Sequence, residues 1–216
     1  MPTDTVKGFP IPSVRRLPLY LRLLRELRGE GHDSVSCTRI AESLDQGTVQ
    51  VRKDLAITGI VGRPKVGYQI PELIDAIETF LGWKNTRDAF LVGAGSLGSA
   101  LLGYEGFGDS GLNIVAAFDT NPEKVGTRIH EKEVLDWESF HDLAHRMHIL
   151  IGILTVPADV AQEVTNAMIL AGIRAIWNYT PAKLEVPPTI VVEDVRLSSS
   201  LAMLSSRLTR LLESQR

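Results

Sequence analysis

A glycine-rich motif near the middle of the chain, Gly93-Ala94-Gly95-Ser96-Leu97-Gly98, carries the clearest chemical signal in the sequence. The apolar run at residues 89–92 precedes it, and residues 96–107 have the composition of a helix that opens inside the motif. A strand, a glycine turn and a helix in this order are typical of a dinucleotide-binding loop. Gly93 permits the tight turn, Gly95 lets the backbone approach a pyrophosphate, and Gly98 lets helix and strand pack closely. The helix N-terminus adds unpaired N–H groups that favour phosphate.

An acidic residue follows the next predicted strand at the spacing expected of a ribose ligand. The second apolar run, Asn113 to Phe118, is followed by Asp119, 21 residues after Gly98. A carboxylate at this point accepts hydrogen bonds from a ribose 2′-hydroxyl and repels a 2′-phosphate. Neither Thr120 nor Asn121 is a cation that could hold such a phosphate. The pattern favours NAD(H) over NADP(H), against the alternative of a glycine-rich turn in another kind of α/β protein.

Length and composition set the limits within which this site must be built. The 216 residues suit one large domain or two small ones, either able to bury a core. No stretch approaches 18 uninterrupted apolar residues, and the start of the chain lacks the apolar core of a signal peptide. The single cysteine, Cys37, excludes an internal disulfide and is interpreted as a half-buried filler rather than a redox thiol. We therefore expect a cytoplasmic protein with no membrane span.

The charge is unevenly distributed along the chain. The net charge is −3, but residues 1–70 hold 11 Lys and Arg against 7 Asp and Glu, so the remainder is acidic. We call residues 1–70 the head of the chain. A mildly basic head followed by an acidic remainder favours the binding of phosphates by the head.

The head contains the elements of a helix-turn-helix. An amphipathic helix is predicted from Val14 to about Arg28, with its leucines on one face. Two short helices follow, Cys37–Leu44 with Ser36 as its N-cap and Thr48 to about Ile57, separated by a tight turn. In the latter helix, apolar residues can pack inward while three polar residues project outward: Gln50, Arg52 and Lys53.

A basic hairpin completes the predicted head. Residues 59–68 suggest two very short strands around a tip that carries Arg63 and Lys65, and a further helix spans Pro71–Leu81. A helix-turn-helix with such a wing indicates a recognition helix for the DNA major groove and a wing for phosphates or an adjacent groove. The alternative is a three-helix protein–protein module with a solvated basic face.

The second domain alternates strands and helices, which predicts a Rossmann-type doubly wound parallel sheet. The expected domains are a winged helix at 1–84, an NAD(H)-binding domain at 85–196 and a dimerisation helix at 197–216. The further elements are predicted at Asp136–Met147 (helix), Ile149–Val156 (strand), Ala158–Ala171 (helix), Ile173–Tyr179 (strand) and Thr189–Glu193 (strand). Thr155-Val156-Pro157-Ala158 and Asn178-Tyr179-Thr180-Pro181 close two of these strands, so both are expected to line the nicotinamide side of the cleft.

A heptad-like leucine stripe marks the last segment. Its members are Leu197, Leu201, Leu204, Leu208 and Leu211. A single helix of this length gains little by itself, so it must bury this stripe either on its own domain or, as we expect, on a partner subunit.

Two constellations resemble catalytic or metal sites but fit the pattern poorly. Tyr179 and Lys183 have the spacing of the catalytic pair of short-chain dehydrogenases, but Pro181 between them disfavours the helix that such a pair needs. Three histidines recur at helical spacing and could coordinate a metal: His141, His145 and His148. They are better explained as part of a solvent-exposed polar helix face. We expect no catalytic residues and no metal.

Several motifs together resemble one known family, the Rex redox-sensing transcriptional repressors, over nearly the whole chain. They are Arg16-Leu17-Pro18-Leu19-Tyr20, Gln50-Val51-Arg52-Lys53-Asp54-Leu55, Gly67-Tyr68, Gly93 to Gly98, Phe118-Asp119, Pro122, Lys124-Val125-Gly126, Thr155-Val156-Pro157-Ala158 and Pro181. The resemblance implies a homodimer that binds a palindromic DNA operator and is released by NADH, while NAD⁺ competes and permits binding. The competing hypothesis is an NAD-dependent oxidoreductase whose N-terminal helices serve dimerisation.

Pattern and resemblance together yield two sets of candidate residues. Those for NADH or NAD⁺ are Gly93, Ala94, Gly95, Ser96, Leu97, Gly98, Asp119, Lys124, Thr155, Val156, Pro157, Asn178, Tyr179 and Tyr104. Those for DNA are Arg16, Thr48, Gln50, Arg52, Lys53, Arg63, Lys65 and Tyr68.

The chain also departs from the family pattern. The wing, usually rich in Phe-Gly, is Thr58-Gly59-Ile60-Val61-Gly62, and the Asn-Phe-Ala-Pro turn is residues 178–181, Asn-Tyr-Thr-Pro. The resemblance implies an Asp at the start of the last helix that joins Arg16 and Tyr104, but Arg196 occupies that position. The NADH-linked switch is then weakened, rewired through Glu193 or Asp194, or lost.

Overall fold

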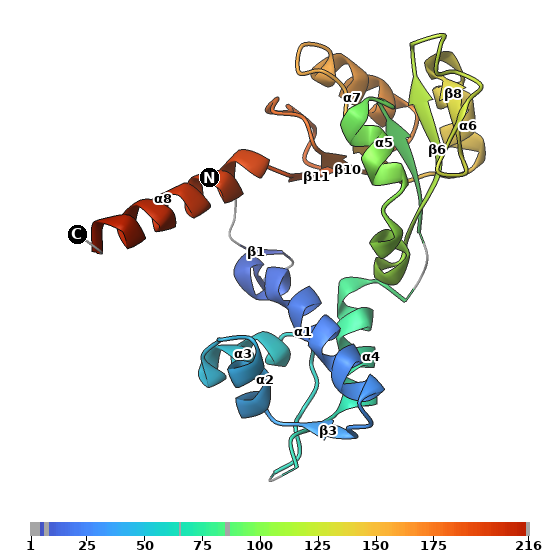
Figure 1. Ribbon diagram of the computed structural model, residues 1–216. Coiled ribbons are helices and arrows are strands. Elements are labelled where there is room, and N and C mark those ends of the chain that lie inside the picture. Colours follow the sequence, from blue (N-terminus) through green and yellow to red (C-terminus); the bar gives the residue numbers. More distant parts are fainter. Residues whose placement is uncertain (1–4, 7–8, 65, 85–86, 215–216) are drawn as a thin grey trace. The chain divides into compact units, whose positions relative to one another are not determined.

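The computed structural model describes residues 5–6, 9–64, 66–84 and 87–214, and the chain forms two compact units, Met1–Asn85 and Thr86–Arg216. Each unit is described by itself (Figure 1). No helix in the described part of the chain is long and apolar enough to cross a membrane.

Unit 1 is built on helices packed around one apolar core. Its helices are α1 (Ile11–Gly29), α2 (Cys37–Ser43), α3 (Thr48–Ala56) and α4 (Ile70–Leu81). Its strands are β1 (Thr5–Val6), β2 (Phe9–Pro10), β3 (Ser34–Val35) and β4 (Tyr68–Gln69). The core combines the leucine face of α1 with Ile40, Val51, Leu55 and Leu73, each fully buried. The amphipathic spacing of α1 thus fixes the surface on which α2 and α3 rest.

The helix-turn-helix forms at the predicted residues. The Ser36 hydroxyl accepts a hydrogen bond from the Arg39 N–H (3.1 Å), which caps α2. The turn between α2 and α3 places Asp45 in the left-handed region (φ 49°). The wing differs from prediction, because it holds a single bridge between Arg63 and Gly67 instead of two strands.

Unit 2 is a seven-stranded sheet in the order β11-β10-β9-β5-β6-β8-β7, parallel except for β7. Its strands are β5 (Arg87–Val92), β6 (Leu112–Asp119), β7 (Arg128–Ile129), β8 (Lys132–Asp136), β9 (Ile151–Leu154), β10 (Ala175–Asn178) and β11 (Val191–Asp194). Its helices are α5 (Ser96–Leu102), α6 (Phe140–Arg146), α7 (Ala161–Leu170) and α8 (Leu197–Ser214), with short 3₁₀ turns at Glu105–Ser110 and Trp137–Ser139. The strand order reverses between β5 and β9, which confirms the doubly wound fold and places its switch point there.

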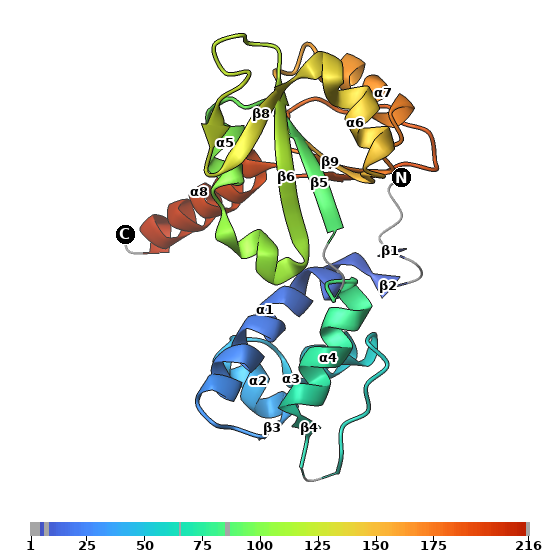
Figure 2. The same cartoon turned by 90° about the vertical axis from the view of Figure 1, so that its right-hand side faces the viewer.

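Apolar side chains cover both faces of the central strand, β5. The side chains of Phe90 and Val92 belong to the apolar cluster that includes residues of α6 and α7, and those of Ala89 and Leu91 belong to the cluster that includes α5. The two groups of helices cover opposite faces of the sheet (Figure 2). A parallel strand buried on both faces is a continuous apolar run in the sequence. The run at residues 89–92 has this property, which is why it predicted the strand correctly.

Some predicted elements have different limits or surroundings. The helix expected at Asp136–Met147 begins only at Phe140, because Asp136 ends strand β8 and its carboxylate caps the short turn that follows. Met147, the last residue of the predicted helix, lies outside α6 and is 48% exposed. The β7–β8 hairpin was not predicted, since its short strands are mostly polar.

Candidate functional site

The turn after β5 has the shape that the glycine motif predicts. Gly93 adopts φ +101°, and a Cβ on it would lie 2.9 Å from the backbone carbonyl group of Thr155. Its N–H donates to the Phe118 carbonyl (2.8 Å), which joins the turn to β6. Only glycine fits both the left-handed backbone and the close approach.

The other two glycines of the motif occupy opposite environments. A Cβ on Gly98 would collide with the carbonyl oxygen of Gly93, so this glycine allows α5 to pack against the turn. No heavy atom lies within 4 Å of the Cβ position of Gly95, so that side of the backbone is open. The structure therefore separates a packing glycine from one that a ligand can approach, as the motif predicts.

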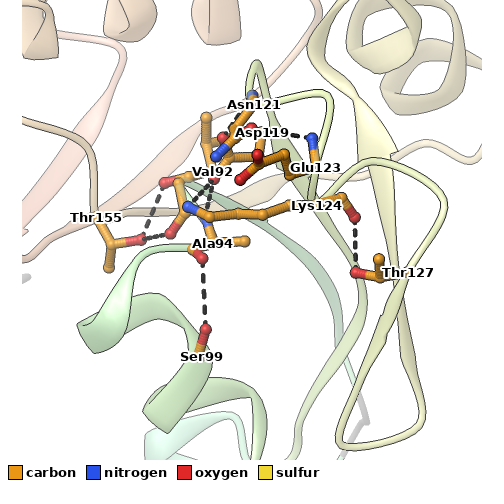
Figure 3. Close-up of polar contacts among 10 residues, drawn as sticks. Val92, Ala94, Ser99, Asp119, Asn121, Glu123, Lys124, Thr127 and Thr155 are labelled. Carbon is orange, nitrogen blue, oxygen red and sulfur yellow. Dashed lines mark hydrogen bonds and ion pairs between the residues drawn. The ribbon is translucent and has the colours of Figure 1, made fainter.

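Thr155, at the end of β9, holds the turn in place. Its hydroxyl lies 2.7 Å from the Gly93 carbonyl oxygen and 3.0 Å from that of Val92, and it donates to this pair (Figure 3). The Thr155 hydroxyl proton is thus engaged with the chain itself. Thr155 contributes to the site mainly by shaping the glycine turn.

Asp119 lies beside the turn, at the end of β6. Its Oδ2 atom accepts from the Ala94 N–H (2.9 Å) and its Oδ1 atom from the Asn121 N–H (2.8 Å) (Figure 3). Burial alone would raise the pKa of this carboxyl, but the Asn121 N–H, the Lys124 ammonium and the Ala94 N–H bring the pKa below its usual value. The side chain is 12% exposed, so an ionised acceptor remains within reach of a bound ribose.

A cation accompanies this carboxylate, which changes the argument about selectivity. The Nζ atom of Lys124 lies 3.1 Å from Oδ2 of Asp119, and both residues line the same pocket. The residues next to Asp119 in the sequence, Thr120 and Asn121, carry no positive charge, but the turn after β6 brings Lys124 back to the carboxylate. The absence of a nearby cation, which the sequence predicted, is therefore wrong.

A pocket of about 760 Å³ joins these residues. The predicted residues that line it are Gly93, Gly95, Asp119, Lys124, Thr155, Val156 and Pro157. The remaining lining residues were not among the predicted nucleotide contacts: Val92, Phe118, Thr120, Trp137, Val160, Glu163 and Val164. Val160 and the first turn of α7 could have been recognised, because they follow the Thr-Val-Pro stretch closely. A size of several hundred Å³ with an apolar wall and few polar groups is typical of a cofactor site.

The second predicted strand end does not share this pocket. Asn178 is fully buried, donates to the Asp194 carboxylate (2.8 Å) and accepts the Thr180 N–H (2.9 Å), so its amide stabilises the β10–β11 edge. Tyr179 packs on Trp177, with ring centroids 5.3 Å apart. Tyr104, 59% exposed, packs on Phe107 beside the same apolar cluster. Asn178 and Tyr179 therefore do not line the pocket that Gly95 and Asp119 share, and their place beside a bound nicotinamide stays a prediction.

The short-chain dehydrogenase pattern also lacks its geometry. Residues 179–183 form no helix, so Tyr179 and Lys183 do not lie one turn apart on a common face. Burial, and secondarily the nearby Tyr104, raises the pKa of Tyr179. A catalytic tyrosine needs the opposite change. Among the described residues, no group of three or more His, Cys, Asp and Glu side chains is arranged to hold a metal ion.

In unit 1, the outer face of α3 carries the expected basic residues. Arg52 and Lys53 are exposed, while Thr48 and Gln50 are partly buried. In the wing, Arg63 is exposed and makes an ion pair with Glu72 (3.3 Å), and Lys65 lies outside the described residues. The second helix of the motif thus presents a cationic surface.

Tyr68 and Arg16 both make contacts within unit 1. Tyr68 is 9% exposed and packs in the core of unit 1. Burial, followed by the Cys37 thiol, raises the pKa of its hydroxyl. Arg16 turns its guanidinium to Asp54, with Nε–Oδ2 at 2.6 Å and Nη2–Oδ1 at 2.8 Å. Tyr68 is corrected to a structural residue, because its ring is buried in the core. Arg16 neutralises a buried carboxylate, and with its side chain 23% exposed its contact with DNA stays a prediction.

The last helix, α8, keeps its apolar stripe uncovered. Leu201, Leu204, Leu208 and Leu211 are each between 52% and 65% exposed, so these leucines do not pack on their own unit. Arg196, just before α8, pairs with Asp194 (3.0 Å), and this neutralises the cation that replaces the expected acid.

The fold and site define a class of protein: a helix-turn-helix unit followed by a doubly wound domain with a dinucleotide-type glycine turn. Two family models match, a "putative DNA-binding protein N-terminus" at residues 9–56 and a "CoA binding domain" at residues 84–182. A redox-sensing transcriptional repressor Rex from Treponema denticola is 50% identical, covering 89% of this chain and 92% of the relative. The chain belongs to the Rex family of redox-sensing transcriptional repressors.

More distant relatives and solved structures agree. The Rex repressor of Bacteroides fragilis is 42% identical over 92% of this chain and 90% of its own. The structure of RSP, a Rex-family repressor, in complex with β-NAD⁺ and operator DNA matches with a TM-score of 0.89 at 36% identity, covering 98% of this chain and 96% of that one. The same repressor in complex with β-NADH gives a TM-score of 0.83 at 37% identity, covering 95% and 97%.

Proposed function

We propose that this chain is a DNA-binding repressor that senses the NADH/NAD⁺ ratio through the pocket beside Gly95 and Asp119. One observation carries the assignment: the open glycine and the ionised ribose acceptor line the same pocket, in a member of the Rex family. The complexes of RSP with β-NAD⁺ and with β-NADH support the nucleotide, and the operator DNA in one of them supports the second ligand. The proposal implies a cytoplasmic protein, because both ligands are found there.

The proposal assigns DNA contacts to α3 and the wing. Arg52 and Lys53 on α3 and Arg63 in the wing supply positive charge for phosphates. The exposed leucines of α8 fit a second copy of the chain, and a two-fold dimer suits a palindromic operator. NADH then releases the DNA and NAD⁺ permits binding.

The competing function, an NAD-dependent oxidoreductase, needs an acid–base group held against the substrate, and the pocket favours no such role: its carboxylates are Asp119, which is bound to the glycine turn, and Glu163, which is exposed to solvent. Asp119 is held ionised by its neighbours, and Tyr179, with its raised pKa, does not line the pocket. We therefore propose that the chain is a regulator without enzymatic activity.

The decisive experiment is a DNA titration with both nucleotides. Duplexes enriched from a randomised library by the full-length chain are titrated at fixed salt, alone and with NADH or NAD⁺. We expect tight binding that NADH weakens and NAD⁺ restores. A chain that enriches no sequence, or one that turns over NAD⁺ with alcohols or hydroxy acids, contradicts the proposal. CoA serves as a control ligand that should compete poorly with NADH for the pocket. The reason is that a Rossmann carboxylate that accepts ribose hydroxyls disfavours the 3′-phosphate of CoA.

A further inference from the structure

We propose that Asp54 is a positioning residue that orients the side-chain amide of Gln50, so that the recognition helix α3 selects adenine at one position of its DNA site. The inference rests on the proposed DNA-binding function and adds a source of base selectivity to it.

Asp54 is a fully buried carboxylate near the end of α3. From α1, it accepts hydrogen bonds from two nitrogens of Arg16 and from the Tyr20 hydroxyl (2.6 Å). From α3 itself, the Nε2 atom of Gln50 donates to Oδ1 (2.8 Å). The carboxylate therefore joins the two helices and reaches one side chain at the start of α3.

The ionised state of Asp54 determines which end of the Gln50 amide faces it. A carboxylate only accepts hydrogen bonds, so the amide must present its NH₂ group and not its oxygen. Burial alone would raise the pKa of Asp54, but Arg16, Tyr20, Ser13 and Gln50 lower it overall, which keeps the acid ionised. A flipped amide would place two oxygen acceptors against each other. Gln50 thus has one preferred orientation.

The other polar atoms of this amide stay available. The Oε1 atom of Gln50 has no hydrogen-bond partner among the described residues, nor is it one of their buried unpaired atoms. It therefore keeps some contact with solvent. One of the two Nε2 hydrogens is also unused, since only the bond to Asp54 engages that nitrogen.

A free oxygen acceptor beside a free N–H is the pattern that matches adenine. A glutamine amide binds adenine through its N6 amino group and N7 atom in the major groove. Gln50 is the third residue of α3, and the N-terminal residues of a recognition helix meet the base edges. Because Asp54 fixes the amide, the unbound protein already holds Gln50 in one rotational state.

The test measures base preference instead of total affinity. Duplexes enriched by the wild-type chain are altered one A·T pair at a time to G·C, and each Kd is measured at fixed salt. We expect one position in each half-site where the wild type prefers A·T by roughly 5- to 150-fold, as a bidentate contact gives. Gln50→Ala and Asp54→Asn should both reduce this preference to about 2-fold or less, at that position alone.

Tyr20→Phe is the matched control, because Tyr20 donates to Oδ2 of Asp54 and not to the oxygen that binds Gln50. It should lower thermal stability and keep the adenine preference. Unchanged discrimination in Gln50→Ala, or in a folded Asp54→Asn protein, overturns the proposal.

If Asp54→Asn does not fold, the wild-type chain still decides the question. We expect one Gln50 side-chain amide proton to exchange at least about tenfold more slowly than its geminal partner by NMR. Free-amide exchange rates for both protons contradict the proposal. A wild-type chain that enriches no duplex overturns the proposed function and this inference with it, whereas selective binding without a Gln50 effect overturns the inference alone.

Discussion

The Nζ atom of Lys124 lies 3.1 Å from the Oδ2 atom of Asp119, so the carboxylate expected to exclude a 2′-phosphate is itself paired with a cation. Selectivity for NADH over NADPH then depends on the balance of the two charges and not on the absence of a cation. Removing the carboxylate of Asp119 should shift the preference toward NADPH, and removing the ammonium group of Lys124 should shift it toward NADH.

Asp119→Asn should weaken NADH binding by about 10- to 100-fold, the effect of losing a charged hydrogen-bond acceptor. It should also improve NADPH binding relative to NADH, because Lys124 becomes free to meet the 2′-phosphate. In the double variant Asp119→Asn/Lys124→Met, the gain for NADPH should disappear. Both affinities can be measured by isothermal titration calorimetry. Continued rejection of NADPH by the single variant, together with unchanged NADH affinity, would falsify the assignment of Asp119.

Substitutions of the motif glycines should separate binding from folding. Gly95→Val should abolish NADH binding and leave the melting temperature nearly unchanged, since no heavy atom lies within 4 Å of its Cβ position. Gly98→Val should destabilise the unit instead, because its Cβ would collide with the Gly93 carbonyl. The comparison requires a thermal melt and an NADH titration of each variant. Equal destabilisation by the two substitutions would contradict the distinct roles.

Arg52→Ala and Lys53→Ala should each weaken DNA binding and leave NADH binding intact. If the residue contacts phosphate, its loss should lower the slope of log K against log salt by about 1 and affect all sequences alike. If it contacts a base edge, the loss should be on the order of 1–3 kcal/mol and confined to one position. Fluorescence anisotropy over a salt series distinguishes these outcomes. Full affinity in the double variant would rule out α3 as the DNA-contacting helix.

Deletion of residues 197–216 should convert a dimer into a weakly associating protein. Two linked DNA-binding units gain affinity through effective concentration, so the truncated chain should bind a two-half-site duplex far more weakly and keep most of its NADH affinity. Light scattering measures the oligomeric state. An intact dimer with normal DNA binding would show that the exposed leucines of α8 are not the dimer contact.

The Asp54 carboxylate should make unit 1 sensitive to acid. Its folded pKa lies below the ordinary value of 3.8, so its contribution to the free energy of unfolding is complete above about pH 4 and is lost as the pH falls through the folded pKa. Asp54→Asn should cost on the order of 3 kcal/mol at neutral pH, because it leaves Arg16 without its buried partner. The difference between wild type and variant should shrink at low pH in denaturant titrations. A constant difference from pH 2 to 7 would contradict this origin.

The sequence predicted the features that depend on neighbouring residues. The run 89–92, the glycine turn and Asp119 each follow from local spacing, and the structure places the end of the run (Val92), the turn and Asp119 around one pocket. The helix-turn-helix was also predicted, because the Ser36 cap and the amphipathic pattern of α1 are local signals.

Features that depend on distant residues were not predictable in the same way. Arg16 and Asp54 are 38 residues apart, and nothing in the spacing indicates that a basic residue of α1 will neutralise a buried acid of α3. Tyr68 in a basic hairpin resembles a DNA contact until the hairpin is seen to turn its ring inward. Asn178 closes a strand as a ligand-binding residue would, yet its amide is used by the neighbouring strand.

The hydrogen bond from Thr155 to the Gly93 carbonyl spans 62 residues of chain. The glycine turn therefore reaches its final shape only when β5 and β9, which lie far apart in the sequence, have paired. Closing a loop of this length has an entropic cost that must be met before the pairing becomes favourable. Nucleotide affinity should consequently arise late in folding, and a fragment that ends before β9 should keep the complete glycine motif and still fail to bind NADH.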